Sequence, residues 1–310
     1  MIASPLNYTG GKYRLLPQLL PLFPRDIRIF ADLFCGGCNV GLNTEAEQVL
    51  YNDADRHLVD LFTTFRTLDR NTALNWIDGI IARYGLSDVS THGYAHYRCD
   101  GATGLAAYNR EPYLRLRRDF NQRVREGRTD DYSNILFYVL IVYAFNNQIR
   151  FNSQGEYNLP VGKRDFNAQM RRKLTGFIDR LQSQNCRFTC RDFRSFDTSG
   201  LGPRDLVYAD PPYLITCATY NEQGGWCEED ERDLLDLLDG LHRRQIRFAL
   251  SNVLRSKGRE NRILLRWLAE RPDYQAVPLD FDYSNSNYHT KDRDSGSEEV
   301  LIVSYPPPVP

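Results

Sequence analysis

Short apolar segments alternate with amphipathic segments along most of this chain. Seven of the apolar segments have the length and composition of β-strands: residues 28–34, 48–52, 186–193, 205–209, 245–250, 274–281 and 298–303. Apolar residues at helical spacing predict helices at residues 12–22, 55–68, 228–241 and 260–269. This alternation predicts an α/β fold built on a doubly wound, mostly parallel, seven-stranded sheet.

The last two predicted strands depart from the alternation. The segment that joins them, residues 282–297, is polar and has no helical pattern. A connection without a crossover helix joins antiparallel neighbours. We therefore expect a closing hairpin and one antiparallel strand at the end of the sheet.

The segment between the second and third predicted strands, residues 53–185, is far longer than a crossover requires. It therefore predicts an inserted domain at residues 56–180, and residues 1–55 and 181–310 then form the domain that contains the sheet.

The inserted segment has a pattern of its own. Residues 112–125 and 132–144 have helical periodicity, and residues 146–162 are rich in Asn, Gly and aromatic residues. We expect a mainly helical domain that carries a β-hairpin or an ordered loop.

Composition narrows the class of protein. The chain is 42% apolar and 25% charged, as in ordinary globular proteins, and no apolar run approaches the roughly 18–20 residues that cross a bilayer. Residues 1–12 lack the basic and apolar regions of a secretory signal. We expect a protein without a membrane role that acts in the cytoplasm.

The charge is unevenly distributed although the net charge is only −1. Thirteen Arg or Lys residues and seven Asp or Glu residues lie between residues 110 and 173, inside the predicted insertion. Such a basic segment fits contacts with DNA phosphates and an ordinary solvated helical face equally well.

The seven cysteines are an odd set in a chain too long to require disulfides, which favours free thiols. Cys35 and Cys38 form a C-x-x-C pair, a spacing that zinc sites also use. The pair lies in a glycine-rich loop, and no second ligand pair has suitable spacing. We therefore expect no metal.

A glycine turn follows the first predicted strand. Residues 30–38 run from apolar residues into Cys35-Gly36-Gly37-Cys38, a layout that brings backbone amides close to a cofactor. Tight turns use glycine whether or not a ligand binds, so this motif alone decides little. The second strand ends at Asp53, where an acid can accept two ribose hydroxyls; capping of the next helix is the structural alternative, and Asp55 can serve as that cap.

The fourth predicted strand ends in Asp210-Pro211-Pro212-Tyr213. Two prolines stiffen the turn, and the carboxyl end of a strand is where ligands bind in open α/β sheets. Such a turn can direct the Asp210 carboxylate and the Pro211 carbonyl at one amino group, while the Tyr213 ring offers a stacking face. A strand-ending turn with a buried tyrosine is the structural alternative.

These motifs occur in an order that resembles the Dam-type, alpha-group DNA adenine-N6 methyltransferases, and the resemblance covers nearly the whole chain. The order is Asn7-Tyr8-Thr9-Gly10-Gly11-Lys12, Asp32-Leu33-Phe34-Cys35-Gly36-Gly37, Asn52-Asp53, the insertion, Asp210-Pro211-Pro212-Tyr213 and Leu250-Ser251-Asn252. Within the insertion, residues 150–162 are similar to the Arg-x-Asn-x-x-Gly-x-aromatic-Asn-x-Pro-x-Gly hairpin of that family.

The resemblance implies S-adenosylmethionine as cofactor. The cofactor contacts that it implies are Tyr8, Lys12, Asp53, Asp192, Asp210 and the loop amides of Phe34, Cys35 and Gly36. Cys38 departs from the family pattern, because related sequences commonly have glycine there. The backbone can therefore approach the cofactor differently at that point.

The resemblance also implies the reaction. A flipped-out adenine in double-stranded DNA would stack on Tyr213, its N6 hydrogens would be accepted by Asp210 and the Pro211 carbonyl, and Pro212 would complete the stiff turn. Methyl transfer would be direct and would use no metal.

The insertion would then be the target-recognition domain. Arg150 matches a base-contacting position, and the other predicted DNA contacts are Asn146, Gln148, Asn152 and Lys163. Residues 146–149 differ from those of GATC-specific members, so the target sequence stays open. Two interpretations, phosphate contact and solvation, are equally good for Arg115, Arg117, Arg118, Arg123 and Arg125. Tyr143 and Phe145 could assist strand distortion, although core packing is favoured for Tyr143.

Two alternatives stay open at this point. One is a cytosine-N4 or RNA methyltransferase, and the other is a catalytically idle DNA-binding recognition subunit. The intact Asp210–Tyr213 turn and the hairpin at residues 150–162 favour the adenine-specific DNA enzyme. A cognate restriction endonuclease is a further candidate partner.

Overall fold

The computed structural model describes residues 1–7, 10–216, 225–280 and 297–308, in two compact units. The sheet unit comprises Met1, Lys12–Ala54 and Asn185–Pro310, and the helical unit comprises Ile2–Gly11 and Asp55–Gln184. Two of these divisions lie beside the predicted boundaries after residues 55 and 180, but residues 2–11, which were predicted to belong to the domain that contains the sheet, group with the helical unit. The recognition role of the helical unit stays a prediction.

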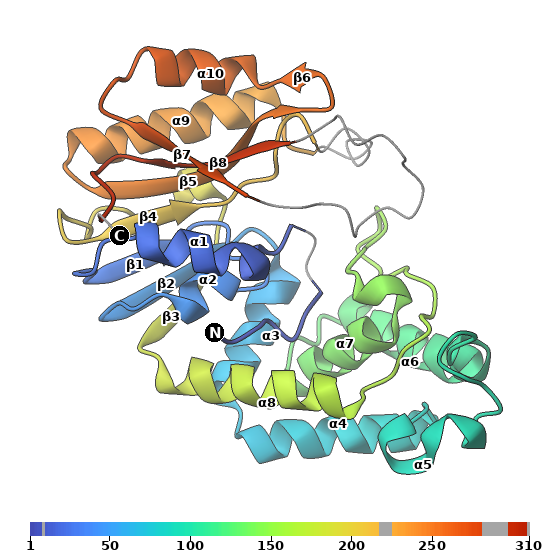
Figure 1. Cartoon of the computed structure of the whole chain (residues 1–310). Coiled ribbons are helices and arrows are strands. Elements are labelled where there is room, and N and C mark those ends of the chain that lie inside the picture. The colour runs from blue at the N-terminus through green and yellow to red at the C-terminus, as the bar shows by residue number, and fades with distance from the viewer. Residues whose placement is uncertain (8–9, 217–224, 281–296, 309–310) are drawn as a thin grey trace. The chain divides into compact units, whose positions relative to one another are not determined.

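The sheet unit contains a mixed, mostly parallel sheet, as predicted (Figure 1). Its strands are β1 (Ile29–Asp32), β2 (Gln48–Asp53), β3 (Cys186–Cys190), β4 (Leu206–Ala209), β5 (Arg247–Ser256), β6 (Arg259–Glu260), β7 (Gln275–Leu279) and β8 (Glu298–Val303). The order is β3-β2-β1-β4-β5-β8-β7, and the two-residue β6 pairs with β5 outside this path. All seven predicted strands are therefore present within the described residues, together with β6, which the sequence pattern did not predict.

The predicted position of the antiparallel strand is wrong. Strand β8 is antiparallel to both β5 and β7 and lies between them, so that β7 forms the edge of the sheet. The hairpin itself is as predicted, but its second strand inserts beside β5. Pro278 lies in β7 and cannot donate a backbone hydrogen bond, which suits an edge strand. Most of the predicted connection, residues 282–297, lies outside the described residues.

The central strands are buried on both faces. Ala31 and Val207 belong to the apolar layer that α9 (Glu228–Arg243) and α10 (Arg262–Ala269) contribute to, and Figure 1 shows these two helices on the same side of the sheet. Phe30 and Tyr208 point to the other face, where their rings stack at 6.1 Å and contact Phe23.

The helix predicted at residues 12–22 is divided into three short pieces: η1 (Lys12–Leu15), α1 (Leu16–Leu19) and η2 (Leu20–Leu22). Pro17 and Pro21 stand in the first turns of α1 and η2 and lack the N–H that a continuous helix would use. The remaining helical pieces of this unit are α2 (Asn39–Asn43) and η4 (Phe193–Ser195), within the described residues.

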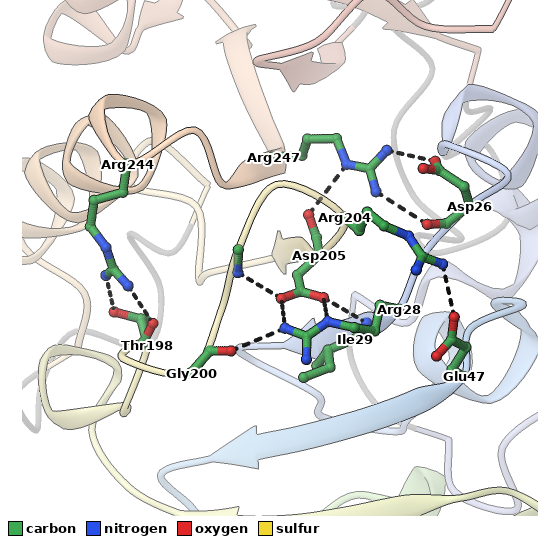
Figure 2. A network of polar contacts seen from close by, with 11 residues as sticks. Asp26, Arg28, Ile29, Glu47, Thr198, Gly200, Arg204, Asp205, Arg244 and Arg247 are labelled. Carbon is green, nitrogen blue, oxygen red and sulfur yellow. Dashed lines mark hydrogen bonds and ion pairs between the residues drawn. The ribbon is translucent and has the colours of Figure 1, made fainter.

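A polar network around Asp205 joins the amino ends of β1, β4 and β5 (Figure 2). The buried Asp205 carboxylate accepts hydrogen bonds from Arg28 Nε at 3.0 Å and from the Ile29 amide at 2.9 Å. Arg247, which begins β5, donates to Asp26 at 2.8 Å. Asp205 precedes β4 and Asp210 follows it, so this network holds the end of the sheet opposite to the Asp210 turn.

The helical unit consists of α3 (Arg56–Thr67), α4 (Arg70–Tyr84), α5 (Val89–His96), α6 (Ala106–Arg125), α7 (Asp131–Tyr143), η3 (Phe145–Asn147) and α8 (Ala168–Ser183) among the described residues. The central helix α7 is buried from Ile135 to Tyr143. Helices α4, α5 and α8 were not predicted, and α6 starts well before the predicted Pro112, which lies inside it.

The predicted hairpin is present as two isolated antiparallel bridges, Ala144 with Val161 and Phe151 with Tyr157. Its base requires glycine at position 162, because a Cβ there would lie 2.3 Å from the Ala144 carbonyl oxygen. The hairpin also packs on α6, where the Arg117 guanidinium donates to the Leu159 carbonyl at 2.8 Å.

Candidate functional site

The Asp210 turn begins directly after β4, at the carboxyl end of a central strand. Lys12, the first residue of η1, reaches it from the amino-terminal segment and is only 6% exposed. Its Nζ lies 2.8 Å from Asp210 Oδ1. The structure therefore brings together two residues that the sequence analysis had assigned to the cofactor and to catalysis.

Tyr213 closes this group. Its single hydroxyl hydrogen is shared between two acceptors, Asp210 Oδ1 at 3.0 Å and Glu299 Oε1 at 3.1 Å, and Lys12 Nζ lies 4.9 Å from its ring centroid. The half-buried ring is thus held by its hydroxyl end.

Glu299 is a member of the group that the sequence analysis did not find. It lies in β8, is 2% exposed, and its Oε1 is 3.7 Å from Lys12 Nζ. One signal could have indicated it. A carboxylate that directly precedes the apolar run of residues 300–303 in a predicted strand needs a partner if it is buried, since an unpaired buried charge is costly.

The electrostatics of the site are set by burial. Burial raises the pKa of Asp210, Lys12 lowers it, Glu299 raises it and the Tyr213 hydroxyl lowers it. Asp32 ends β1 and is 2% exposed; burial raises its pKa to about 8, against a hydrogen bond from the Gly41 amide. Several carboxyl groups therefore gather at the carboxyl ends of the parallel strands.

The glycine loop joins β1 to α2 and connects to the end of β2. The Cys35 amide donates to the Asn52 carbonyl at 2.8 Å, and the Gly36 amide donates to Asp53 Oδ2 at 2.8 Å. The predicted ribose-binding acid and the predicted loop amides are therefore neighbours. Cys38 adopts the left-handed conformation with φ of 60°, so this cysteine takes the backbone shape that glycine favours.

Three aromatic rings lie beside the loop. Phe34 is 5.5 Å from Phe193 and 5.7 Å from Trp226, and Phe193 is 5.5 Å from Trp226 between ring centroids. Trp226 was not predicted as a site residue; it is held by a 2.7 Å hydrogen bond to the buried Glu231. Asp192, the predicted adenine contact, precedes Phe193, caps η4 through the Arg194 amide and forms an ion pair with Arg194.

In the helical unit, Arg150 lies exposed on the hairpin. Its Nε donates to Asn158 Oδ1 at 2.8 Å and its Nη2 to the Asn158 carbonyl at 3.3 Å. Nη1 has no hydrogen bond within the described part of the chain. The guanidinium is therefore oriented by one neighbour and keeps donors for a ligand.

The other predicted DNA contacts differ in their surroundings. Asn146 has φ of 54°, and its carbonyl accepts a hydrogen bond from Asn7 at 3.2 Å. The Asn152 side chain accepts the amides of residues 154 and 156 and so holds the hairpin turn. The Gln148 carbonyl accepts a hydrogen bond from the Tyr157 hydroxyl, and the Lys163 carbonyl accepts one from the Leu105 amide, so both residues use main-chain atoms in these bonds.

Five of the six arginines of α6 are the predicted phosphate-contacting or solvated side chains, and the fold gives them different partners. Four have partners: Arg115 with the Tyr84 carbonyl, Arg117 with the Leu159 carbonyl, Arg123 with Asp130 and Arg125 with Glu156. Arg118 is exposed and has no partner among the residues that the structure describes. Tyr143 is buried and donates to the Ser87 carbonyl, so its role is core packing, whereas Phe145 is 48% exposed.

Tyr8, a predicted cofactor contact, lies outside the described residues. Within them, no group of three or more His, Cys, Asp or Glu side chains is arranged to hold a metal ion. Over the same ranges, every helix is too short or too polar to cross a membrane.

The sequence matches known proteins over most of its length. Residues 8–276 match the family model described as D12 class N6 adenine-specific DNA methyltransferase. The chain is 37% identical to the type II methyltransferase M.FokI of Planomicrobium okeanokoites and 36% identical to the modification methylase StsI of Streptococcus sanguinis, over 98% of this chain in each case. It is 25% identical to the DNA adenine methylase of Escherichia coli strain K12, over 80% of this chain and 79% of that relative. The chain spans only 43% of the length of each of the first two relatives.

Proposed function

Because the chain belongs to the D12 class of N6 adenine-specific DNA methyltransferases, we propose that it transfers a methyl group from S-adenosylmethionine to N6 of an adenine in double-stranded DNA. The observation that carries this proposal is the state of Asp210. Its Oδ1 is held by Lys12 and Tyr213, and its Oδ2 has no hydrogen bond within the described ranges. One oxygen is thus fixed while the other can accept a proton donor from a substrate.

The residues of the sheet unit fit S-adenosylmethionine. Asp53, Asp32 and Asp210 follow one another in this order at the carboxyl ends of β2, β1 and β4, and the carboxylates of Asp53 and Asp210 suit a cofactor that carries a sulfonium and an ammonium group. The aromatic cluster of Phe34, Phe193 and Trp226 offers apolar surface for an adenine ring. When bound, the cofactor supplies an activated methyl group.

The protein would supply position and electrostatics. Asp210 Oδ2 and the Pro211 carbonyl oxygen would accept the two N6 hydrogens and orient the nitrogen lone pair toward the methyl group. Lys12 and Tyr213 would keep the Asp210 carboxylate from rotating. Because N6 is inside the duplex, the base must first leave the stack at a cost of a few kcal/mol, and the Tyr213 ring would offer a replacement stacking surface.

The helical unit would recognise the target. Arg150 is oriented by Asn158, and its Nη1 has no hydrogen bond to any residue that the structure describes, which suits hydrogen bonds to guanine O6 and N7. Phe145 is the exposed aromatic side chain of the same segment and could occupy the space left in the distorted strand. Asn152 would shape the hairpin and not contact a base, since its side-chain oxygen accepts two amides of the turn.

The names of two relatives, a type II methyltransferase and a modification methylase, support a role in a restriction–modification system. We extend this to the chain as a proposal and expect a restriction endonuclease with the same target sequence. That endonuclease should fail to cleave DNA that the chain has methylated.

The proposed reaction can be tested by methylation of unmodified genomic DNA with radiolabelled S-adenosylmethionine, followed by separation of the nucleosides. The expected product is N6-methyladenine. Asp210→Asn should lower the rate by about a hundredfold or more, because the neutral amide is a weaker acceptor and donates hydrogens of its own. Asp273→Asn alters an exposed carboxylate of the same unit and should leave the rate unchanged.

The products of the same assay discriminate the alternatives. N4-methylcytosine, or label in RNA alone, would replace the adenine-specific reaction by another methyl transfer. DNA binding without any transfer by the wild-type chain would identify a recognition module and reject the enzymatic proposal.

A further inference from the structure

Glu299 is a buried carboxylate that the proposed reaction does not use. It is the second residue of β8, pairs with Val253 of β5 and Leu279 of β7 in the sheet, and is 2% exposed. No apolar packing explains a carboxylate in this strand. Its contacts include the two residues that hold Asp210, Lys12 and Tyr213.

Lys12 lies between two carboxylates. Its Nζ is 2.8 Å from Asp210 and 3.7 Å from Glu299, and its side chain is 6% exposed. A lysine paired with Asp210 alone would form a neutral pair and would weaken the negative charge that Asp210 presents to a ligand. With Glu299 included, the group contains two carboxyl groups and one amino group.

We propose that Glu299 is a positioning residue that offsets the charge of Lys12, so that Asp210 faces the cofactor with a negative charge and the site prefers the sulfonium donor over its neutral thioether product. This inference rests on the proposed use of S-adenosylmethionine. The donor and the product, S-adenosylhomocysteine, differ by one methyl group and one positive charge. The ratio of the protein's affinities for S-adenosylmethionine and S-adenosylhomocysteine therefore reports the charge of the site.

A purely structural role for Glu299 is the competing explanation. Glu299 accepts a hydrogen bond from the Tyr213 hydroxyl at 3.1 Å. In this explanation, fixing the position of the Tyr213 ring would be its whole role. The two roles differ in what they predict for charge. Removal of the Tyr213 hydroxyl breaks the ring contact and leaves every carboxylate in place, whereas an amide at position 299 keeps the shape and removes the charge.

The test is the affinity of the full chain for S-adenosylmethionine and for S-adenosylhomocysteine, each measured by calorimetry. Glu299→Gln should lower the preference for the donor by about tenfold, since one nearby charge has been removed. Glu299→Asp keeps the charge and should retain the preference even if it lowers the melting temperature. Tyr213→Phe should also retain the preference.

Glu298→Gln is the matched control. Glu298 is the adjacent residue of β8, is 44% exposed and pairs with Arg255, so its amide variant changes the net charge equally but away from Lys12. Its donor preference should stay at the wild-type value. If Glu299→Gln kept the wild-type preference, or if Glu299→Asp lost it, the charge role would be overturned. Should Glu299→Gln fail to fold, Glu299→Asp and Tyr213→Phe still decide between the two roles.

The inference and the proposed function can fail separately. If the wild-type chain binds the donor with the expected preference but methylates no DNA, the proposed reaction fails and the role of Glu299 stands. If the wild-type chain methylates adenine and the preference of Glu299→Gln is unchanged, only the role of Glu299 fails. A wild-type chain that binds neither ligand would reject the cofactor.

Discussion

At the scale of single residues, sequence reasoning found the groups that a contiguous motif contains and missed those that only the fold brings in. Asp210 and Tyr213 are three positions apart and end a strand, so their proximity is predictable. Glu299 lies 86 positions beyond Tyr213, and its contact depends on β8 inserting beside β5. The predicted position of β8 was wrong, which placed Glu299 out of reach of the sequence argument.

Asp32 gives a prediction about stability and pH. Burial raises its pKa to about 8 from an ordinary value of 3.8, with further raising by Asp210 and Asp53 and lowering by the Gly41 amide. Between these values the folded chain holds a proton that the unfolded chain releases. The contribution of Asp32 to the free energy of unfolding is therefore fully present below pH 3.8, and it is lost as the pH rises through about 8.

Asp32→Asn should remove this pH dependence. Relative to the wild type, its free energy of unfolding should rise as the pH is raised from about 5 to about 8, with a limiting slope of about 1.4 kcal/mol per pH unit. Urea unfolding of both proteins at several pH values measures this difference in the free energy of unfolding. Glu45→Gln, at an exposed position of the same unit, should follow the wild-type curve. Parallel curves for Asp32→Asn and the wild type would show that Asp32 is ionised in the folded chain.

At the scale of elements, the strands were easier to predict than the helices. The central strands are continuous apolar runs because both of their faces are buried, as in the fully buried β4. Helix α4 was missed because its apolar stripe is interrupted by polar residues, and α8 because a run of basic residues precedes its buried face. The sequence pattern predicts a helix start at Pro112, but α6 begins at Ala106 and continues through this proline.

The hairpin provides a prediction about an element. Gly162→Ala places a Cβ 2.3 Å from the Ala144 carbonyl oxygen, which is backbone and cannot move aside without opening the hairpin base. We expect a loss of about 2 kcal/mol or more in the free energy of unfolding, together with weaker DNA binding because Arg150 is displaced. Denaturant unfolding and a duplex-binding titration measure the two effects.

A second glycine of the helical unit serves as the control for this change. Gly176 lies in α8, and a Cβ there meets nothing within 4 Å. Gly176→Ala should therefore raise the free energy of unfolding by about 0.5–1 kcal/mol through helix propensity and leave DNA binding unchanged. Equal losses from Gly162→Ala and Gly176→Ala would contradict the close approach at the hairpin base.

At the scale of the whole molecule, the proposed function assigns methyl transfer to the sheet unit and DNA recognition to the helical unit. The carboxyl groups of the proposed methyl-transfer site belong to the sheet unit, and the basic segment at residues 110–173 belongs to the helical unit. This distribution is hidden in the net charge of −1. The basic composition does not predict which arginines are available for DNA, because four of the six arginines of α6 form contacts that hold the unit together.

Two arginines of the helical unit should then affect DNA binding in different ways. Arg150 has an oriented guanidinium on the hairpin, so Arg150→Ala should cost about 1–3 kcal/mol on the target sequence and much less on unrelated duplexes. Arg118 is exposed without a partner among the described residues, which suits a phosphate contact. Arg118→Ala should weaken binding to all duplexes alike and reduce the salt dependence by about one ion.

Binding titrations over a range of salt concentrations, on duplexes with and without the target sequence, separate these effects. Arg125→Ala is the comparison for Arg118→Ala, because Arg125 pairs with Glu156 and its loss should change the salt dependence less. Unaltered sequence preference in Arg150→Ala would move recognition away from the hairpin. Since the sheet unit contains none of the substituted residues, methyl transfer at saturating DNA should keep its wild-type rate in all three variants, and a lower rate there would show that the two functions are not divided between the units.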